Sequence, residues 1–304
     1  MSGEWVTMGR KRRFPGIVLV ALLVFPAPSL GGASLTGTAA NSAVARQTLA
    51  YGSLPAQQLD IWMVPTSDHP APLVMFVHGG AWMYGNRNTA GSQWLPAHLT
   101  RQGYVYASID YRLVPTVTVE EQAEDVVHAL KALLDRATEL GVDRHRVVLM
   151  GHSAGAHLVA LVGTDERYLK SVGLSFADLR GVIANDGAAY DVPAQMREDG
   201  RMMQRTYRTV FGDDPARQRA LSPTHNAAAP NASAFLLLHV ERPDGVRQAE
   251  ALGRALAAAG TAVEYGSFSG KGLLGHIQIN RKLGNPDHAA TAVVDAWLSK
   301  ILAK

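Results

Sequence analysis

Short apolar runs recur along the chain, and stretches with helical spacing separate them. Residues 58–64 alternate between apolar and polar, as in an edge or antiparallel strand. Residues 73–77 are continuously apolar, which is typical of a strand buried on both faces. Further strands are expected at 104–109, 147–150, 181–184, 235–240 and 262–268.

Apolar positions at helical spacing predict helices between these strands. The clearest helix covers 119–140, where Gly141 is expected to end it. Others are expected at 94–102, 157–162, 246–259 and 289–302. Strands that alternate with helices favour an α/β fold with a mostly parallel central sheet and helices on both faces. Active sites of such sheets lie beyond the C-terminal ends of the strands.

The region 46–304 is long enough for one large α/β domain and short for two. Residues 187–230 fall between two predicted strands, and 197–219 are rich in arginine. We interpret 187–230 as a small cap insertion over the site. The alternative is an ordinary amphipathic crossover helix.

The first 45 residues form a distinct leader. Four basic residues at 10–13 precede the apolar segment 17–25, and a stretch rich in Pro, Gly, Ser and Ala follows. This pattern predicts a secretory signal peptide, cleaved after Ala33 or Ala45, because nine apolar residues are too few to span a bilayer. The protein is then secreted or periplasmic, without a stable membrane anchor. An uncleaved N-terminal anchor is the alternative.

The bulk composition is that of an ordinary globular protein. Charged residues make up 18% and hydrophobic residues 47% of the chain, and the net charge is +3. Much of the positive excess lies in the leader, so the charge gives no reason to expect a nucleic-acid partner. Cysteine is absent, which rules out a disulfide and a thiol nucleophile.

The pentapeptide Gly151-His152-Ser153-Ala154-Gly155 follows the apolar run 147–150 and precedes a predicted helix. A serine between two such glycines at a strand-to-helix turn is typical of a nucleophile elbow, in which the hydroxyl is held out at the strand end. A side chain in place of either glycine would collide with neighbouring backbone. The alternative is a small-residue loop that packs a helix against a sheet.

A nucleophilic serine needs a base, which in turn needs a group that orients it. His276 is preferred among the histidines because it lies far downstream in the glycine-rich segment 270–276, which we predict to be a loop after the last strand. His225 and His288 are the rivals, although neither follows a strand end.

Several carboxylates compete for the role of the orienting acid. Asp244 is preferred because it lies just after the strand at 235–240, and Glu241 is the second choice. Asp244 could instead cap the following helix. Asp186 and Asp191, beyond the strand at 181–184, are third choices that could equally bind substrate or cap a helix.

Acyl transfer also needs donors aimed at the developing oxyanion. One candidate is the backbone amide of Ala154, directly after the serine. The others are the amides of Gly80 and Ala81 in His78-Gly79-Gly80-Ala81-Trp82, which follows the central strand 73–77. We expect Gly79 mainly to allow the bend of this loop.

Together these motifs resemble those of small secreted or periplasmic esterases of the α/β-hydrolase superfamily. The chain is similar to hormone-sensitive-lipase-like carboxylesterases and to arylformamidase-like enzymes with a His-Gly-Gly-x-Trp loop. The resemblance runs from Tyr51-Gly52-Ser53 and Leu59-Asp60-Ile61 through Asp110-Tyr111-Arg112-Leu113 to the His276 segment. It implies an α/β-hydrolase fold, a triad of Ser153, Asp244 and His276, and an oxyanion hole from Gly80, Ala81 and Ala154.

Two departures from the family pattern matter. The family commonly places its acid in a His-Gly-x-x-Asp pattern, whereas His239 and Asp244 are one position further apart. Ala81 replaces the glycine that is usual in the lipase-like branch, which favours the formamidase-like branch.

We therefore expect a serine hydrolase that cleaves small-molecule carboxylic esters, with short-chain or aryl substrates favoured. An arylformamidase-like amide hydrolase is the first alternative, and a non-catalytic binding domain on the same fold is the second. No closely spaced ligand set for a metal and no phosphate-binding loop occur in the sequence, so no cofactor is expected.

Overall fold

The computed structural model describes residues 46–64, 69–88, 91–198, 201–228 and 230–303, and these residues belong to one compact unit. The signal peptide predicted within residues 1–45 lies outside the described residues. Among the residues described, no helix is both long and apolar enough to cross a membrane.

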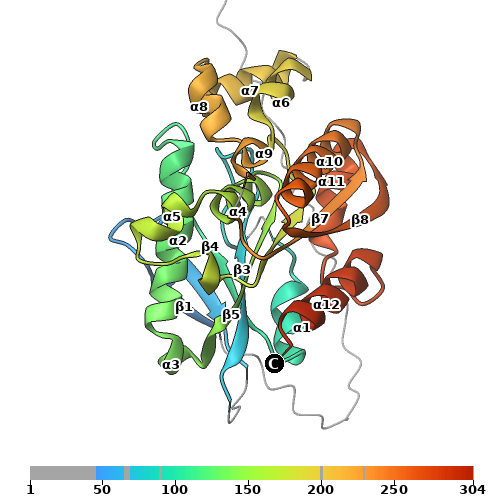
Figure 1. Ribbon diagram of the computed structural model, residues 1–304. Coiled ribbons are helices and arrows are strands. Elements are labelled where there is room, and N and C mark those ends of the chain that lie inside the picture. The colour runs from blue at the N-terminus through green and yellow to red at the C-terminus, as the bar shows by residue number, and fades with distance from the viewer. Residues whose placement is uncertain (1–45, 65–68, 89–90, 199–200, 229, 304) are drawn as a thin grey trace, which may run out of the picture. The chain divides into compact units, whose positions relative to one another are not determined.

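A single eight-stranded sheet runs through the molecule in the order β1-β2-β4-β3-β5-β6-β7-β8 (Figure 1). The pairs β1/β2 and β2/β4 are antiparallel, and all other pairs are parallel. The strands are β1 Arg46–Ala50, β2 Gln58–Trp62, β3 Ala71–Val77, β4 Val105–Ile109, β5 Val142–His152, β6 Gly181–Asn185, β7 Ala234–Glu241 and β8 Ala262–Lys271. The predicted mostly parallel sheet is confirmed.

Helices cover both faces of this sheet because successive strand residues point to opposite sides. Along β5, Val147 and Leu149 pack into one apolar cluster, while Val148 and Met150 pack into the other. The helices are α1 Leu95–Arg101, α2 Val119–Asp135, α3 Ala137–Leu140, α4 Ala154–Thr164, α5 Glu166–Ser171, α6 Val192–Glu198, α7 Arg201–Phe211, α8 Pro215–Ala220, α9 Pro223–Asn226, α10 Pro243–Ala258, α11 Gly272–Arg281 and α12 Ala289–Ile301, with a short 3-10 helix at Phe176–Asp178.

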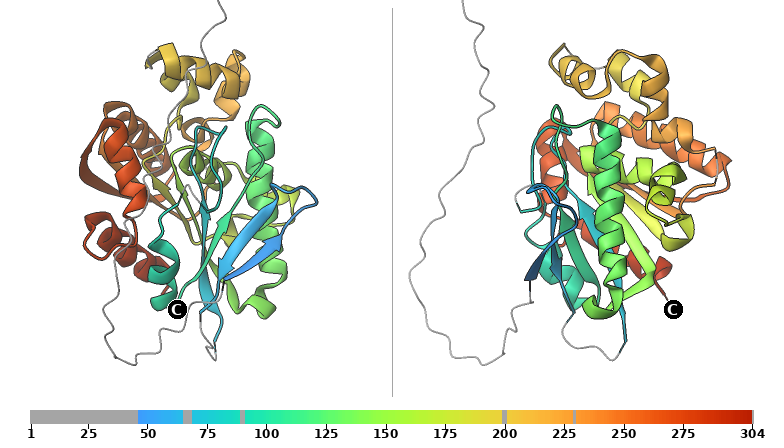
Figure 2. Two further views of the ribbon diagram at one scale, coloured as in Figure 1. Left: turned by 180° about the vertical axis from the view of Figure 1, so that it is seen from behind. Right: turned by 90° about the vertical axis from the view of Figure 1, so that its left-hand side faces the viewer.

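The two layers of helices have different partners. Apolar residues of α2, α4 and α10 fill the first cluster, and those of α1, α11 and α12 fill the second. Figure 2 shows α1 and α12 side by side in the view from behind, where His98 Nε2 lies 2.8 Å from Asp295 Oδ1. The core therefore lies on both sides of the central strands.

The predicted strands and long helices are present, with three differences. Strand β1 was missed because only Leu49 of its residues is buried, so its sequence carries no alternating pattern. The predicted helix at 119–140 is divided into α2 and α3 at Arg136. The predicted loop at 270–276 is wrong, since strand β8 continues to Lys271 and helix α11 begins at Gly272 and carries His276.

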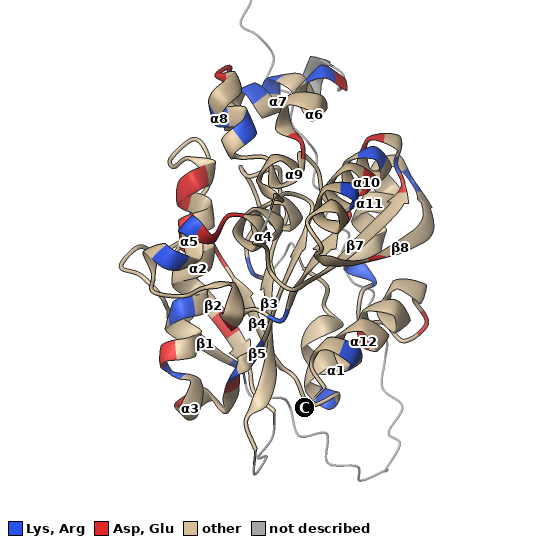
Figure 3. Cartoon of the chain, viewed as in Figure 1, with Lys and Arg blue, Asp and Glu red and all other residues tan. Residues whose placement is uncertain are grey.

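Helices α6 to α9 occupy the chain between β6 and β7, where the cap insertion was expected. Figure 1 shows α7 and α8 beyond the C-terminal ends of the parallel strands, and several Lys and Arg positions are coloured blue on these helices in Figure 3. Two ion pairs tie it to the rest of the fold: Arg217 to Glu120 of α2 at 2.7 Å, and Arg247 of α10 to Glu198 of α6 at 2.6 Å.

His157 gives the fold a pH-dependent stability. Its side chain is completely buried in α4, Nε2–H donates to the carbonyl of Leu221 (2.8 Å), and Nδ1 accepts from the indole N–H of Trp82 (3.2 Å). Burial lowers the pKa of His157 to about 4, although its hydrogen bond to Leu221 acts in the opposite direction. The unfolded chain therefore binds a proton that the folded chain does not in the window between about pH 6.5 and 4.

We expect the free energy of unfolding to fall as the pH is lowered through this window, by about 1.4 kcal/mol per pH unit from His157 alone. The variant His157→Gln should be less stable at pH 7 but should have a shallower slope by that amount. Urea denaturation at a series of pH values from 6 to 4.5 measures both. His128→Gln, at an exposed position of α2, is the matched control. An unchanged slope in His157→Gln would contradict this account.

Candidate active site

Ser153 lies at the turn between β5 and α4 with a backbone conformation of φ 55° and ψ −120°. This left-handed conformation is strained for a residue with a side chain, at a cost of roughly 1–3 kcal/mol. The turn is held by the backbone hydrogen bond from Ser153 N–H to the carbonyl of Asn185 (3.1 Å) and by that from His157 N–H to the carbonyl of Ser153 (3.1 Å). The predicted nucleophile elbow is present.

The two glycines of the elbow stand where the backbone leaves no room for a side chain. A Cβ on Gly151 would lie 2.2 Å from the carbonyl oxygen of Gly155. A Cβ on Gly155 would lie 2.1 Å from the carbonyl oxygen of Val77, at the end of β3. Glycine at both positions therefore lets α4 start directly against the ends of β3 and β5.

His276 lies between Ser153 and a buried carboxylate. Its Nε2 is 3.0 Å from Ser153 Oγ, and its Nδ1 is 2.6 Å from Asp186 Oδ2. Since the carboxylate only accepts, Nδ1–H donates to Asp186, and Nε2 is left to accept from the serine hydroxyl. The Asp186 side chain is fully buried, whereas that of His276 is 13% exposed. This is the geometry of a nucleophile, a base and an orienting acid.

The carboxylate that the structure brings to His276 is therefore that of Asp186, not that of Asp244, which the sequence favoured. Asp244 lies in the first turn of α10, where its carboxylate pairs with Arg242 at 2.7 Å. Glu241 is exposed at the end of β7. Strand β6 pairs directly with β5 whereas β7 lies one strand further away, so the residue after β6 is the one placed beside the elbow.

The remaining candidates are not in contact with Ser153 or His276 in the hydrogen bonds of the described residues. Asp191 caps α6, accepting from the amide of Ala194 (3.0 Å), and its carboxylate is 3.5 Å from His225. His288 precedes α12 as its N-terminal cap residue. A signal for Asp186 was available in the sequence, since it follows the apolar strand at 181–184 after a single residue, but Asp191 and Asp244 shared that kind of position.

Asp186 is held as a carboxylate by its surroundings. Burial by itself raises the pKa of Asp186, but the hydrogen bond from His276 and the positive charge of Arg242 outweigh it, so the net pKa is lowered. Arg242 Nε is 3.6 Å from Asp186 Oδ2, and the amide of Val240 donates to Oδ1 at 3.3 Å. The acid is therefore ionised at neutral pH and able to orient His276.

The loop after β3 lies immediately beside the serine. A Cβ on Gly79 would be 2.9 Å from Ser153 Cβ, so Gly79 is needed for this close approach as well as for the bend. Gly80, Ala81 and Trp82 all have positive φ, at 134°, 52° and 60°. Within the described part of the chain, no backbone acceptor takes the amides of Gly80 and Ala81. They are available as oxyanion donors, together with the amide of Ala154 at the first position of α4.

Trp82 anchors this strained loop. Its carbonyl accepts from Gln122 Nε2 (2.7 Å) and from the amide of Val114 (3.0 Å). Its indole ring is 1% exposed and packs edge-on against His157 and against Phe211 of α7, with ring centroids 5.2 and 4.9 Å apart. Burial of this large side chain offsets part of the strain of the loop.

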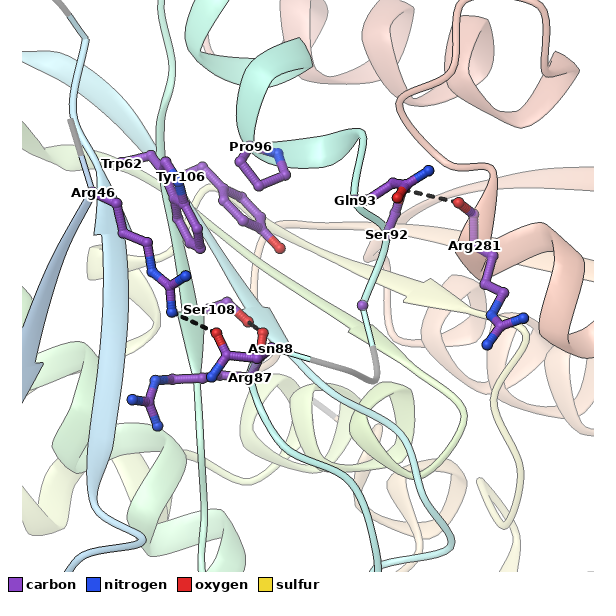
Figure 4. Close-up of a pocket in the computed structure, with 11 residues that line it drawn as sticks. Arg46, Trp62, Arg87, Asn88, Ser92, Gln93, Pro96, Tyr106, Ser108 and Arg281 are labelled. Atoms are coloured by element: carbon purple, nitrogen blue, oxygen red, sulfur yellow. Dashed lines mark hydrogen bonds between the residues drawn. The ribbon is translucent and has the colours of Figure 1, made fainter. Parts of the chain in front are cut away.

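A separate cavity of about 470 Å³ is lined by residues of β1, β2 and β4 and of the segment 87–96 (Figure 4). Ser153, Asp186 and His276 do not line it. Trp62 and Tyr106 form an aromatic wall, with ring centroids 5.4 Å apart, and the guanidinium of Arg46 lies 5.3 Å from the Trp62 ring. Across the cavity, Ser92 Oγ lies 3.1 and 2.5 Å from the carbonyl oxygens of Arg281 and Leu283, which joins the segment around Ser92 to the end of α11. In the described ranges, no group of three or more acidic, histidine or cysteine side chains could hold a metal ion.

A mostly parallel sheet with a serine elbow after a central strand and a downstream histidine defines the class of α/β-hydrolases. The family model BD-FAE matches residues 59–240, and the chain belongs to that family. The matched residues include the Gly79-Gly80 loop, Ser153 and Asp186 and end before His276.

Curated relatives match less than half of the chain. A probable isoprenylcysteine α-carbonyl methylesterase of Arabidopsis thaliana, ICMEL2, is 32% identical over 45% of this chain and 32% of its own length. Esterase LipC of Mycobacterium tuberculosis is 41% identical over 40% of this chain and 30% of its own length. The kynurenine formamidase of Drosophila melanogaster is 35% identical over 35% of this chain and 34% of its own length. The chain thus spans about a third of the length of these relatives.

Solved structures share the fold over most of the chain. Esterase B of Lactobacillus rhamnosis superposes with a TM-score of 0.71 at 22% identity, covering 85% of this chain and 86% of that one. Esterase 2 of Thermogutta terrifontis, phosphonylated by sarin, superposes with a TM-score of 0.68 at 20% identity, covering 84% and 94%. The predicted α/β-hydrolase fold is confirmed.

Replacing Asp186 and Asp244 in turn should show which of the two carboxylates orients His276. In Asp186→Asn, His276 loses the carboxylate that holds its Nδ1–H, so we expect kcat for a hydrolysed substrate to fall by about four orders of magnitude. The matched variant Asp244→Asn loses only the pair with Arg242 and should keep kcat within a few-fold. Steady-state kinetics of both purified proteins measure this. A larger loss in Asp244→Asn than in Asp186→Asn would reverse the assignment.

Proposed function

We propose that this chain is a serine hydrolase that cleaves carboxylic esters. The observation that carries the proposal is the chain of hydrogen bonds from Ser153 Oγ through His276 to the buried carboxylate of Asp186. The names of two relatives, a methylesterase and an esterase, agree with it. Serine is a poor nucleophile at neutral pH, and this arrangement supplies the base that it needs.

Each residue of the site has a definite step in this mechanism. Ser153 Oγ attacks the ester carbonyl carbon while His276 Nε2 takes the hydroxyl proton, and the carbonyl oxygen becomes an oxyanion held by the amides of Gly80, Ala81 and Ala154. Collapse of the tetrahedral species breaks the bond to the alkoxy oxygen, and His276 returns the proton to the departing alcohol. Water, activated by His276, then hydrolyses the acyl-enzyme on Ser153 to release the carboxylic acid.

The amide hydrolase is the second candidate. The same residues could attack an N-formyl carbonyl, with His276 delivering its proton to the departing amine. Ala81 in the His-Gly-Gly-x-Trp loop and the similarity to a kynurenine formamidase favour this reading. The formyl group is the smallest acyl group, so a site limited to it should also refuse long acyl chains.

Turnover of p-nitrophenyl esters from acetate to decanoate tests the proposed function. We expect the short esters to be cleaved best and Ser153→Ala to lose activity by about four or more orders of magnitude. Ser171→Ala, at an exposed serine of α5, is the matched control and should keep full activity. Parallel assays with formanilides decide between ester and amide. If folded protein cleaves neither substrate and a fluorophosphonate fails to label Ser153, the chain is a binding domain instead.

We also infer that the protein is exported. Support comes from the basic residues at 10–13 and the apolar segment 17–25. Expression of the whole chain in a bacterial host should yield a product in the periplasm or medium that lacks the leader, with an N-terminus after Ala33 or Ala45. Replacing Leu22 and Leu23 by Asp should keep the product inside the cell at full length. Full-length product from the unaltered chain, retained in the membrane fraction, would indicate an anchor instead.

A further inference from the structure

His152 is the residue before the nucleophile, and its side chain lies beneath the helix that carries the base. It ends β5, where it is paired in register with Asn185 of β6. Met150, two residues earlier and on the same face of the sheet, packs in the cluster that also holds Ile279 of α11. The His152 residue is only 7% exposed. It is thus a buried polar group in contact with the site but absent from the proton relay.

The contacts of His152 join three parts of the site. Its Nε2 is 3.0 Å from the backbone carbonyl oxygen of His276. Because a carbonyl only accepts, Nε2 carries the proton and donates. The rings of His152 and His276 are tilted by 33°, with centroids 4.5 Å apart. On its other side, a Cβ on Gly79 would lie 2.8 Å from the His152 carbonyl oxygen and 3.0 Å from its Nδ1.

The buried position of His152 beside His276 favours its neutral form. Burial is the largest effect on it, and with the positive charge of His276 it lowers the pKa of His152 to about 3, against the opposite effect of Asp186. Arg242 also lowers this pKa. His152 is therefore neutral at neutral pH. It adds no positive charge beside an imidazolium that forms during the reaction.

We propose that His152 is a positioning residue that anchors the turn carrying His276 and supports its ring from behind. The hydrogen bond to the His276 carbonyl sets the height of α11 over the elbow, and the ring contact limits rotation of the His276 imidazole. Together they keep Nε2 at the serine hydroxyl and Nδ1–H on Asp186. A misplacement of the base by about 1 Å can lower the rate by a factor of about 100, so the positioning should be visible in kcat. The kinetic test of this inference rests on the proposed function.

Two variants separate the hydrogen bond from the ring. His152→Gln retains an N–H donor on a side chain of similar reach, whereas His152→Phe retains a ring without the donor. We expect His152→Phe to lower kcat by about 10- to 100-fold with KM changed by less than about three-fold, and His152→Gln to recover much of that loss. His128→Gln, at an exposed histidine of α2, is the matched control and should match the unaltered protein.

A second readout needs no substrate. The proton between His276 Nδ1 and Asp186 should give a low-field proton NMR signal in the unaltered protein, and we expect it to broaden or vanish in His152→Phe and to persist in His152→Gln. Circular dichroism checks that each variant is folded. If the unaltered protein neither cleaves esters nor is labelled by a fluorophosphonate, the proposed function is wrong. The low-field NMR signal would still test whether His152 positions His276.

Three outcomes would overturn the inference: unchanged kcat and an unchanged low-field signal in His152→Phe; a folded His152→Gln that loses as much as His152→Phe; or a loss that falls on KM alone. If His152→Phe fails to fold, a folded His152→Gln with near-normal kcat and signal supports the inference, and one without them overturns it.

Discussion

The whole site depends on how closely the start of α4 approaches the end of β3. The missing side chain of Gly155 allows the backbone of α4 to rest against the carbonyl of Val77, where a Cβ would be only 2.1 Å away. This approach places Ser153 next to the loop that leaves β3, so the serine hydroxyl and the amides of Gly80, Ala81 and Ala154 converge from separate elements. The strained backbone of Ser153 persists because β3, β5 and β6 hold the turn from both sides.

The carboxylate of Asp186 is buried together with its partners, which limits the cost of removing its charge from water. Asp186 has the histidine, the Val240 amide and a nearby arginine around it, and Arg242 in turn bonds to the carbonyl of Gly187 (2.7 Å) and to Asp244. Asp244 does not contact His276; it pairs with Arg242, which lies beside Asp186. In a site of low dielectric such paired charges keep their positions through a reaction, which is the basis of electrostatic preorganisation.

The same aromatic cluster serves the oxyanion loop and the insertion. Trp82 from the loop, His157 from the nucleophile helix and Phe211 from α7 pack on one another, with a second aromatic contact from Tyr207 at 6.0 Å between ring centroids. A change in how α7 packs would therefore reach the donors of the oxyanion hole through Trp82. The insertion and the loop after β3 are therefore mechanically linked.

Local patterns along the chain were enough to predict most elements, the elbow, the loop after β3 and the choice of His276, because each depends on neighbouring residues: apolar periodicity, glycines around a serine, and chain order. The partner of His276 was not predictable in this way. Asp186, Asp191 and Asp244 all follow strands, and which of them meets the histidine depends on the order of strands in the sheet. Strand β6, not β7, lies beside β5, and α11 brings His276 to the residues that follow these two strands. The tertiary structure alone decided the acid, the helical setting of His276 and the place of His152 beneath it, because each arises from contacts between residues far apart in the chain.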